Sequence, residues 1–268
     1  MRNLHDHKCA DYRIHGKSQP EINSGIRGGL MKILEIKHLK KSYRGHQVLE
    51  DINFSLKPNQ IFGLIGPNGV GKTTIIGSIC GLVKYDKGTI LLDGRSLEDE
   101  PQLRRKIGCC FQEPVFDMFF NIRDTIAYNA MYHGLSMKEA RDATDLVLDQ
   151  VKLSNVAHLR GSELSGGMKK RFQLAIAMVF DPEILILDEP TAGVDLELSD
   201  LIQQTISAFS QRKGKSLILT GHDIKEMQIL CSQAAFIQEG VIIKNGTVAS
   251  FGNLEKEYRR LYIHEDKI

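Results

Sequence analysis

Nine consecutive residues that follow an apolar run and open a helix-like run constrain this chain more than any other part of it. The apolar run is Ile61–Ile65, and the helix-like run covers residues 73–83. The residues that join them satisfy the pattern G-x-x-x-x-G-K-[ST]. They are Gly66, Pro67, Asn68, Gly69, Val70, Gly71, Lys72, Thr73 and Thr74. We call residues 66–74 the phosphate loop, because a strand, a glycine-rich turn and a helix start direct backbone N–H groups at phosphate oxygens.

Each residue type in the phosphate loop has a chemical reason. Glycine adopts backbone conformations closed to other residues, and without a Cβ it lets successive N–H groups converge on one anion. Lys72 supplies a positive charge for the β and γ phosphates, and Thr73 supplies a hydroxyl for Mg²⁺. The helix that starts there adds about half a positive charge at its N-terminus. The loop therefore predicts a site for the phosphates of a nucleotide.

A second apolar run, residues 184–187, ends in the two carboxylates Asp188 and Glu189. Taken alone, adjacent acids at a strand end are more often a solvated turn. Together with a phosphate loop, Asp188 is expected to hold Mg²⁺, and Glu189 to orient an attacking water or to take its proton. The pair and the loop predict a hydrolase that acts on the terminal phosphate of a nucleotide.

Strand-like and helix-like patterns alternate along most of the chain. The strand-like runs are residues 33–36, 48–56, 61–65, 107–111, 184–187, 216–220, 234–237 and 241–244. Helical periodicity dominates residues 113–160, with helices predicted at 124–132 and 136–151. The second helix opens with Ser136 and Glu139 in capping-box spacing. Its predicted inward stripe is Ala140, Ala143, Leu146 and Val147. This alternation predicts an α/β fold with a mainly parallel sheet and a helical insertion.

The two ends of the chain differ from this pattern. Residues 1–30 are expected to be a disordered leader, and residues 254–268 a C-terminal tail, around a domain at 31–253 with a helical subdomain at about 113–180. The leader carries potential metal ligands whose spacing fits no closed tetrahedral site. These are His5, His7, Cys9 and His15.

Composition excludes several classes of protein. The 268 residues include 35 Lys and Arg and 33 Asp and Glu, which gives a net charge of +2. So small a positive charge is not typical of a protein that binds nucleic acid directly. No apolar run is long enough to span a bilayer, and the N-terminus lacks a secretory h-region, so a cytoplasmic protein is expected. The five cysteines are scattered, which indicates neither a disulfide framework nor a zinc site.

Residues 164–171, Leu-Ser-Gly-Gly-Met-Lys-Lys-Arg, resemble the LSGGQ signature of ATP-binding cassette (ABC) ATPases. The resemblance covers about residues 32–250 and implies a P-loop NTPase fold with an N-terminal antiparallel β subdomain and an inserted α-helical subdomain. It implies that Ser165, Gly166 and Gly167 contact the γ phosphate of ATP held by a second ABC ATPase subunit. A head-to-tail dimer, expected to be a homodimer, would then enclose two ATP molecules with Mg²⁺.

Four further positions are similar to family motifs. By this resemblance Tyr43 stacks on adenine, and Gln112 contacts the metal and the attacking water. Asp195 is expected to contact the partner subunit, and His222 to hydrogen-bond the γ phosphate. Each of these residues, taken alone, is more often a structural or surface residue. Three residues depart mildly from the family pattern: Val70 in the phosphate loop, Met168 in the signature and Gly221 before His222.

A single cassette without a long coiled-coil insertion is typical of ABC transporter motors. The membrane-spanning permease is then expected to be a separate chain, with this protein peripheral on the cytoplasmic face of the membrane. Residues expected either to dock that permease or to form helical-subdomain core are Pro114, Phe116, Met118, Phe119 and Phe120. Residues 167–171 and 190–195 look most like ABC-2 type exporters, although the basic side chains at 169–171 are also typical of a solvated helix face. The alternative is a soluble ABC-type ATPase that serves as a regulatory or DNA-maintenance module without transport.

Overall fold

The structure is a computed structural model that describes residues 33–113 and 119–263. The described residues belong to one unit, residues 31–268. The predicted leader at residues 1–30 lies outside them, and so do three of the predicted docking residues, Pro114, Phe116 and Met118.

Strands of the described residues form one ten-stranded sheet in the order β5-β4-β1-β2-β10-β9-β3-β8-β7-β6. In chain order they are β1 (Leu34–Tyr43), β2 (His46–Leu56), β3 (Ile61–Ile65), β4 (Lys87–Leu92), β5 (Arg95–Ser96), β6 (Ile107–Cys110), β7 (Ile184–Asp188), β8 (Ser216–Gly221), β9 (Gln233–Gln238) and β10 (Val241–Thr247). In this order, each strand from β9 through β3, β8 and β7 to β6 pairs in parallel with the next. At the other end of the sheet, β5, β4, β1 and β2 pair antiparallel with one another. The predicted P-loop fold, with a mainly parallel core sheet and an N-terminal antiparallel subdomain, is confirmed.

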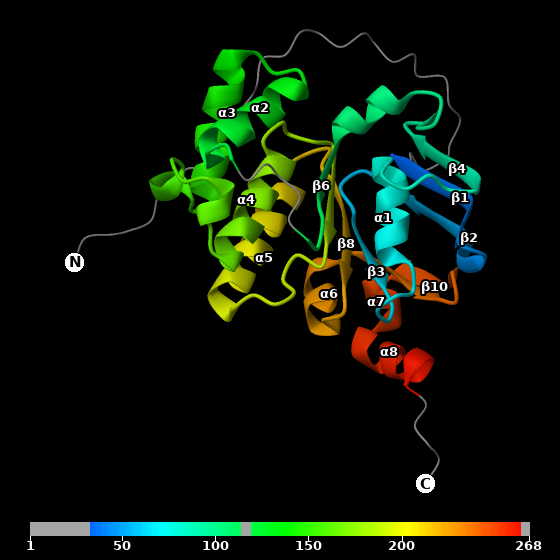
Figure 1. Ribbon diagram of the computed structural model, residues 1–268. Helices are drawn as coiled ribbons and strands as arrows, with labels where there is room; N and C mark the ends of the chain where they lie inside the picture. Colours follow the sequence, from blue (N-terminus) through cyan, green and yellow to red (C-terminus); the bar gives the residue numbers. More distant parts are fainter. Residues whose placement is uncertain (1–32, 114–118, 264–268) are drawn as a thin grey trace. The chain divides into compact units, whose positions relative to one another are not determined.

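Helices connect the parallel strands and form the insertion. They are α1 (Lys72–Cys80), α2 (Ile122–Tyr132), α3 (Met137–Gln150), α4 (Gly166–Met178), α5 (Leu196–Ser210), α6 (Ile224–Leu230), α7 (Val248–Phe251) and α8 (Leu254–Tyr262). Short 3₁₀ turns occur at Pro101–Lys106, Ser154–Val156 and Gly161–Glu163. Helices α2 and α3, in green in Figure 1, form the inserted helical part and pack on α4. Within the described residues no helix has the length and apolar character that a membrane crossing requires.

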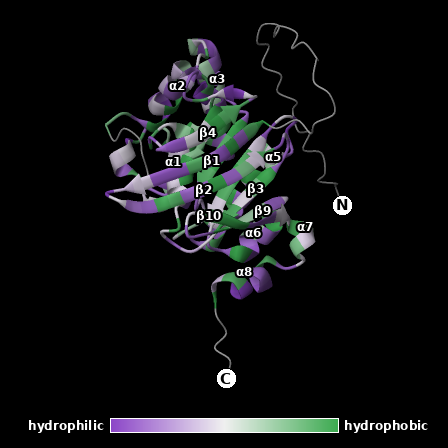
Figure 2. Cartoon of the chain, turned by 90° about the vertical axis from the view of Figure 1, so that its right-hand side faces the viewer, coloured by the Kyte–Doolittle hydropathy of each residue, from purple (hydrophilic) through white to green (hydrophobic). Residues whose placement is uncertain are grey.

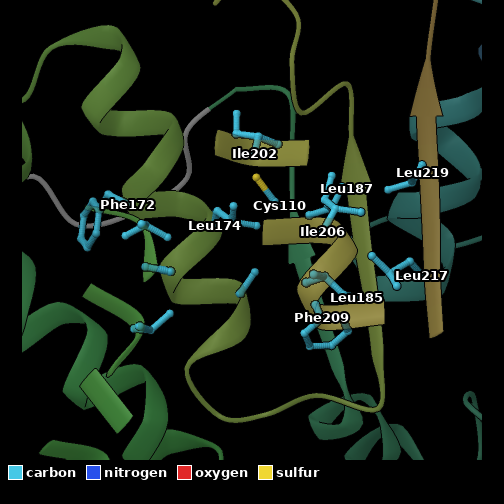
Figure 3. Close-up of a cluster of buried hydrophobic side chains, with 14 of the residues drawn as sticks. Cys110, Phe172, Leu174, Leu185, Leu187, Ile202, Ile206, Phe209, Leu217 and Leu219 are labelled. Atoms are coloured by element: carbon cyan, nitrogen blue, oxygen red, sulfur yellow. The ribbon is translucent and has the colours of Figure 1, made fainter. Parts of the chain in front are cut away.

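Side chains of the parallel strands alternate between two hydrophobic clusters. One face packs against α4 and α5, as Figure 3 shows for Leu185, Leu187, Leu217 and Leu219. The opposite face contributes to the cluster that holds α1 and the antiparallel strands; its members from β7 and β8 are Ile184, Ile186 and Ile218. Because both faces are covered, β7 and β8 are buried along their whole length, which explains why their sequences are continuous apolar runs.

Helix α1 is shorter than its periodicity predicts. It ends at Cys80 rather than at Val83, because Gly81 takes a left-handed conformation with φ of 79°. Its N–H and that of Leu82 bond back to carbonyls of the last turn, which closes the helix.

The buried stripe of α3 is also rotated from the predicted one. Leu146 is 42% exposed, whereas Thr144 and Leu148 are fully buried beside Ala140 and Val147. Thr144 tolerates burial because its hydroxyl donates to the carbonyl of Ala140, at 2.6 Å. A polar residue thus occupies the core position that the apolar pattern assigned to a neighbour.

Residues 254–268, set off by the sequence as a tail, include α8. Much of this helix is hydrophilic in Figure 2, yet Leu254 at its start is fully buried. The backbone N–H of Leu254 donates to Oε1 of Gln228 in α6, at 2.7 Å. Helix α8 therefore packs on the domain through its first turn.

Candidate active site

The phosphate loop connects β3 to α1 with the backbone geometry that its glycines allow. Gly69 and Gly71 have φ of 79° and 106°, in the region that favours glycine. A Cβ at Gly71 would lie 2.7 Å from Leu49 Cδ2 of β2, so the loop also packs too closely for a side chain there. In the described part of the chain, α1 is the one α-helix whose N-cap residue makes no side-chain hydrogen bond. Its first N–H groups therefore remain available to an anion.

Lys72 lies over the phosphate loop and is 5% exposed. Its ammonium group donates to the carbonyls of Gly66 at 2.8 Å and Pro67 at 3.1 Å. Burial lowers the pKa of Lys72, while the nearby carboxylates of Glu189 and Asp188 act in the opposite direction. An ammonium group has three N–H donors, so one remains for a further acceptor beyond the two carbonyls.

Asp188 ends β7 and is 1% exposed. Its Oδ2 accepts a hydrogen bond from the Thr73 hydroxyl at 2.8 Å, and its Oδ1 accepts one from the Thr220 hydroxyl. Because the Thr73 hydroxyl donates its proton to Asp188, its lone pairs are free to bind a cation. The carboxylate thus joins the start of α1 to the neighbouring strand β8.

Glu189 has a left-handed backbone, with φ of 49°. This conformation costs a non-glycine residue on the order of 1–3 kcal/mol and persists only where its surroundings enforce it. Here the Glu189 N–H donates to both oxygens of Thr220, the carbonyl at 3.2 Å and the hydroxyl at 3.1 Å. The turn directs the side chain away from the sheet ladder and into a cluster of polar groups.

The Glu189 side chain meets the two other residues predicted to be catalytic. Its Oε2 accepts from Gln112 Nε2 at 3.2 Å and lies 3.5 Å from His222 Nδ1. The side chain of Glu189 is 9% exposed and that of His222 is 58% exposed, so the cluster is open on the histidine side. Lys170 of α4 donates to the carbonyl of Gln112 at 2.9 Å. The structure therefore brings Gln112, Glu189 and His222 together beside the phosphate loop.

Ser165, Gly166 and Gly167 occupy the start of α4. The Ser165 hydroxyl caps the helix by accepting from the Met168 N–H at 3.3 Å. Ser165 and Gly166 are exposed, and a Cβ at Gly166 would meet no atom within 4 Å. Among the described residues, no hydrogen bond joins this helix start to the phosphate loop, Asp188, Glu189 or His222.

Asp195 and Tyr43 lie at two other edges of the site. Asp195 caps α5 by accepting from the Leu198 N–H at 2.8 Å. It lines a cleft of about 320 Å³ that also contains Glu189 and His222. Tyr43 ends β1, is 45% exposed and has the Lys41 ammonium 5.0 Å from its ring centroid. No hydrogen bond in the described chain joins Tyr43 to the phosphate loop.

Two polar residues of the site are absent from the sequence-based prediction. Thr220 hydrogen-bonds with both Asp188 and Glu189. Its position as a polar residue at the end of the apolar run 216–220 is the sequence feature that could have indicated a role in the site. Glu226 of α6 lines the same cleft, and its Oε2 accepts from the Thr191 hydroxyl at 2.5 Å. Burial raises the pKa of Glu226.

The residues present fit a nucleotide triphosphate with a divalent cation. The uncapped helix start and Lys72 offer donors to phosphate oxygens. The Thr73 hydroxyl, the Asp188 carboxylate and the side-chain amide oxygen of Gln112 are oxygen donors of the kind that Mg²⁺ prefers.

Comparisons with known proteins test the family resemblance drawn from the sequence. The family model described as ABC transporter matches residues 49–192. The Nod factor export ATP-binding protein I of Paraburkholderia xenovorans is 37% identical over 214 residues, which cover 80% of this chain and 70% of that protein. The lipopolysaccharide export system ATP-binding protein LptB of Haemophilus influenzae is 32% identical over 240 residues, 88% of this chain and 98% of that protein.

A solved structure of the ATP-binding subunit of an ABC transporter has the same fold. It matches with a TM-score of 0.79 and 26% sequence identity, over 85% of this chain and 98% of that one. The fold, the family model and the relatives thus agree with the resemblance drawn from residues 164–171. The chain belongs to the ABC transporter family.

Proposed function

We propose that this chain hydrolyses ATP to power export by a separate membrane-spanning partner. Family membership implies ATP binding and hydrolysis. The observation that carries the assignment of residues is the cluster in which Gln112 and His222 converge on Glu189, next to the phosphate loop.

The phosphate loop binds the phosphates of ATP. Backbone N–H groups of residues 66–74 and the Lys72 ammonium neutralise charge on the phosphate oxygens. Thr73, Asp188 and Gln112 would hold Mg²⁺, which neutralises charge on the transferred phosphoryl group. Tyr43 packs on the adenine ring, an interaction worth about 1–3 kcal/mol for bases on aromatic side chains.

Glu189 acts on the attacking water. Its carboxylate accepts a hydrogen bond from that water and takes its proton as the oxygen attacks the γ phosphorus in line with the leaving oxygen of ADP. Gln112 and His222 hold the carboxylate on either side, and His222 donates to a γ-phosphate oxygen. The bond between the γ phosphorus and the bridging oxygen breaks, which leaves ADP and phosphate.

The start of α4 serves the second nucleotide of a head-to-tail dimer. Ser165, Gly166 and Gly167 combine a hydroxyl, glycine amides and a helix N-terminus on an exposed surface, which suits an anion held by another subunit. Asp195, in the cleft beside Glu189, contacts that subunit. Because no hydrogen bond joins the described α4 start to this chain's own phosphate loop, the proposal predicts that one chain alone hydrolyses ATP slowly.

An aromatic surface on the inserted helical part is the proposed docking face for the permease. Its most exposed members are Phe119 (82%), Tyr132 (73%), Tyr128 (57%) and Phe120 (53%). The rings of Phe120 and Tyr128 pack edge to face, with centroids 6.1 Å apart. Adjacent exposed aromatic side chains mark interaction sites with proteins or membranes. Binding there would place this subunit at the cytoplasmic face of the membrane.

Export, and membership of the ABC-2 type exporters, are proposed from two sources. Residues 167–171 and 190–195 look most like that group, and two relatives are named for export of Nod factor and of lipopolysaccharide. The solute itself is left open, because this subunit need not contact it.

The test is purification of the chain from detergent-solubilised membranes, followed by ATPase assay of whatever complex it forms. We expect a membrane-spanning partner to co-purify, and turnover to fall roughly 10² to 10⁴-fold in Glu189→Gln. Retention of the chain in the soluble fraction with all its natural partners present would instead favour a regulatory or DNA-maintenance ATPase.

A further inference from the structure

Helix α8 reaches the end of β3, which leads into the phosphate loop, and the end of the neighbouring strand β9. The Tyr262 hydroxyl lies 2.7 Å from the carbonyl oxygen of Ile237 in β9 and 3.4 Å from that of Ile65, the last residue of β3. The two strands pair in parallel up to Ile65 and Phe236, so the hydroxyl lies where their ladder ends. A hydroxyl has one proton to donate, and the shorter contact makes the Ile237 carbonyl its main acceptor.

The carbonyl that Tyr262 binds is also in contact with the phosphate loop. A Cβ at Gly66 would lie 2.8 Å from the Ile237 oxygen, so Gly66 packs directly on it. The carbonyl of Gly66 in turn accepts from the Lys72 ammonium at 2.8 Å. Three contacts therefore connect the C-terminal helix with the lysine of the phosphate loop, through Ile237 and Gly66.

Tyr262 is held in this position by the rest of α8. Leu254 at the helix start is buried and bonds to Gln228 of α6, and Glu257 pairs with Lys244 of β10 at 2.8 Å. The Tyr262 ring packs against that of Tyr258, with centroids 4.7 Å apart. Burial raises the pKa of Tyr262, so the hydroxyl keeps the proton that it donates.

We propose that Tyr262 is a positioning residue, which fixes the Ile237 carbonyl and through it the phosphate loop in the conformation that binds nucleotide. The proposal rests on the proposed function, because it assigns Tyr262 an effect on ATP affinity. Without the hydroxyl, the ends of β3 and β9 lose a shared donor, and Gly66 loses a fixed packing partner. Nucleotide affinity then falls more than turnover at saturating ATP, because within the described residues the Tyr262 hydroxyl bonds to the strand ends and not to Gln112, Glu189 or His222.

The test compares Tyr262→Phe with Tyr258→Phe in the full chain. Both variants remove one hydroxyl from α8 and keep the ring, but the Tyr258 hydroxyl makes no hydrogen bond among the described residues. For Tyr262→Phe we expect the Kd for ADP and the KM for ATP to rise about two- to tenfold, the effect of one neutral hydrogen bond, with kcat unchanged. In nucleotide-free protein, amide hydrogen exchange at residues 66–74 should be faster than in wild type. Tyr258→Phe should match wild type in all of these measurements.

Several results would overturn the proposal. One is wild-type affinity and exchange in Tyr262→Phe, and another is the same change in both variants. A third is a fall in kcat together with a lower unfolding midpoint, which would indicate general destabilisation. If the wild-type chain bound no nucleotide, the proposed function would fail, whereas the exchange measurement on nucleotide-free protein would still decide whether Tyr262 orders the loop.

Discussion

Replacing Thr220 with valine removes one hydroxyl from the site and nearly conserves side-chain volume. Thr220 is 1% exposed, and its hydroxyl donates to Asp188 and accepts from the Glu189 N–H. Of the two side-chain hydrogen bonds that Asp188 accepts within the described residues, the one from Thr73 remains after the change, and the Glu189 N–H keeps the Thr220 carbonyl at 3.2 Å. The main loss is therefore one hydrogen bond to a buried carboxylate. Such bonds contribute about 1.5–3 kcal/mol, so we expect the free energy of unfolding to fall by about 2–3 kcal/mol.

Activity should fall for a second reason, which concerns the backbone of Glu189. Its left-handed conformation, with φ of 49°, is unfavourable for a residue with a side chain, and the Thr220 hydroxyl is one of two Thr220 oxygens that accept from its N–H. A displaced carboxylate no longer meets Gln112 and the attacking water in one geometry. If the loss at the transition state is about 1.4 kcal/mol, kcat falls about tenfold.

Urea denaturation and steady-state ATPase measurements test the two expectations, with Thr220→Ser as the matched control. Serine keeps the hydroxyl and loses one methyl group, which costs about 1 kcal/mol of stability in a core. Thr220→Ser should therefore retain most of the wild-type kcat. Wild-type kcat in Thr220→Val would refute the reasoning, and equal losses in the two variants would show that packing rather than the hydroxyl matters.

Three other changes test the remaining parts of the site. Glu189→Gln should bind ATP normally and hydrolyse it roughly 10² to 10⁴-fold more slowly, since an amide takes no proton; undiminished phosphate release would exclude Glu189 as the base. Lys72→Ala should abolish tight nucleotide binding in calorimetric titration, because it removes both the positive charge and the two bonds to loop carbonyls; ordinary ATP affinity would contradict this role. Burial raises the pKa of Glu226 above its usual 4.5, so the folded state binds that proton more tightly than the unfolded chain. The contribution of Glu226 to the free energy of unfolding is fully present below pH 4.5 and is lost as the pH rises through the folded-state pKa of this group. In urea titrations the free energy of unfolding of Glu226→Gln should therefore increase relative to that of wild type as the pH increases. The same pH dependence of this free energy in the two proteins would disprove the raised pKa of Glu226.

The sequence predicts the elements that carry the site because their signals are local. A glycine-rich turn between a buried strand and a helix requires only neighbouring residues, and so do the apolar runs that end at Asp188 and Thr220. Strand β4 has no comparable signal, since it depends on pairing with a distant strand, β1, and β5 is a two-residue strand that pairs with β4. Helix α8 is missed for a similar reason. Its sequence is mostly charged, and its order depends on anchors in α6 and β10.

Residue roles at the site were harder to predict than its location. The two bonds of Thr220 depend on which strand lies next to β7, and that order is not local information. The left-handed turn at Glu189 follows from those bonds rather than from any preference of glutamate. By contrast, Gln112 and His222 were selected by family resemblance, and the structure brings both to Glu189. Their catalytic roles stay predictions until variants are measured.

The register of three parallel strands, β6, β7 and β8, accounts for two of the contacts in the site. Cys110 of β6 pairs with Leu187 of β7. Gln112 follows Cys110 by two residues, and Glu189 follows Leu187 by two residues, so the two residues leave the sheet at the same level. Asp188 pairs directly with Thr220 of β8, where their side chains share a face and bond. A slip of one residue between β7 and β8 would turn Thr220 to the opposite face and leave Asp188 without that donor. Catalytic geometry and sheet pairing thus depend on the same hydrogen bonds, and a substitution that loosens β7 from β8 should lower activity at denaturant concentrations too low to unfold the protein.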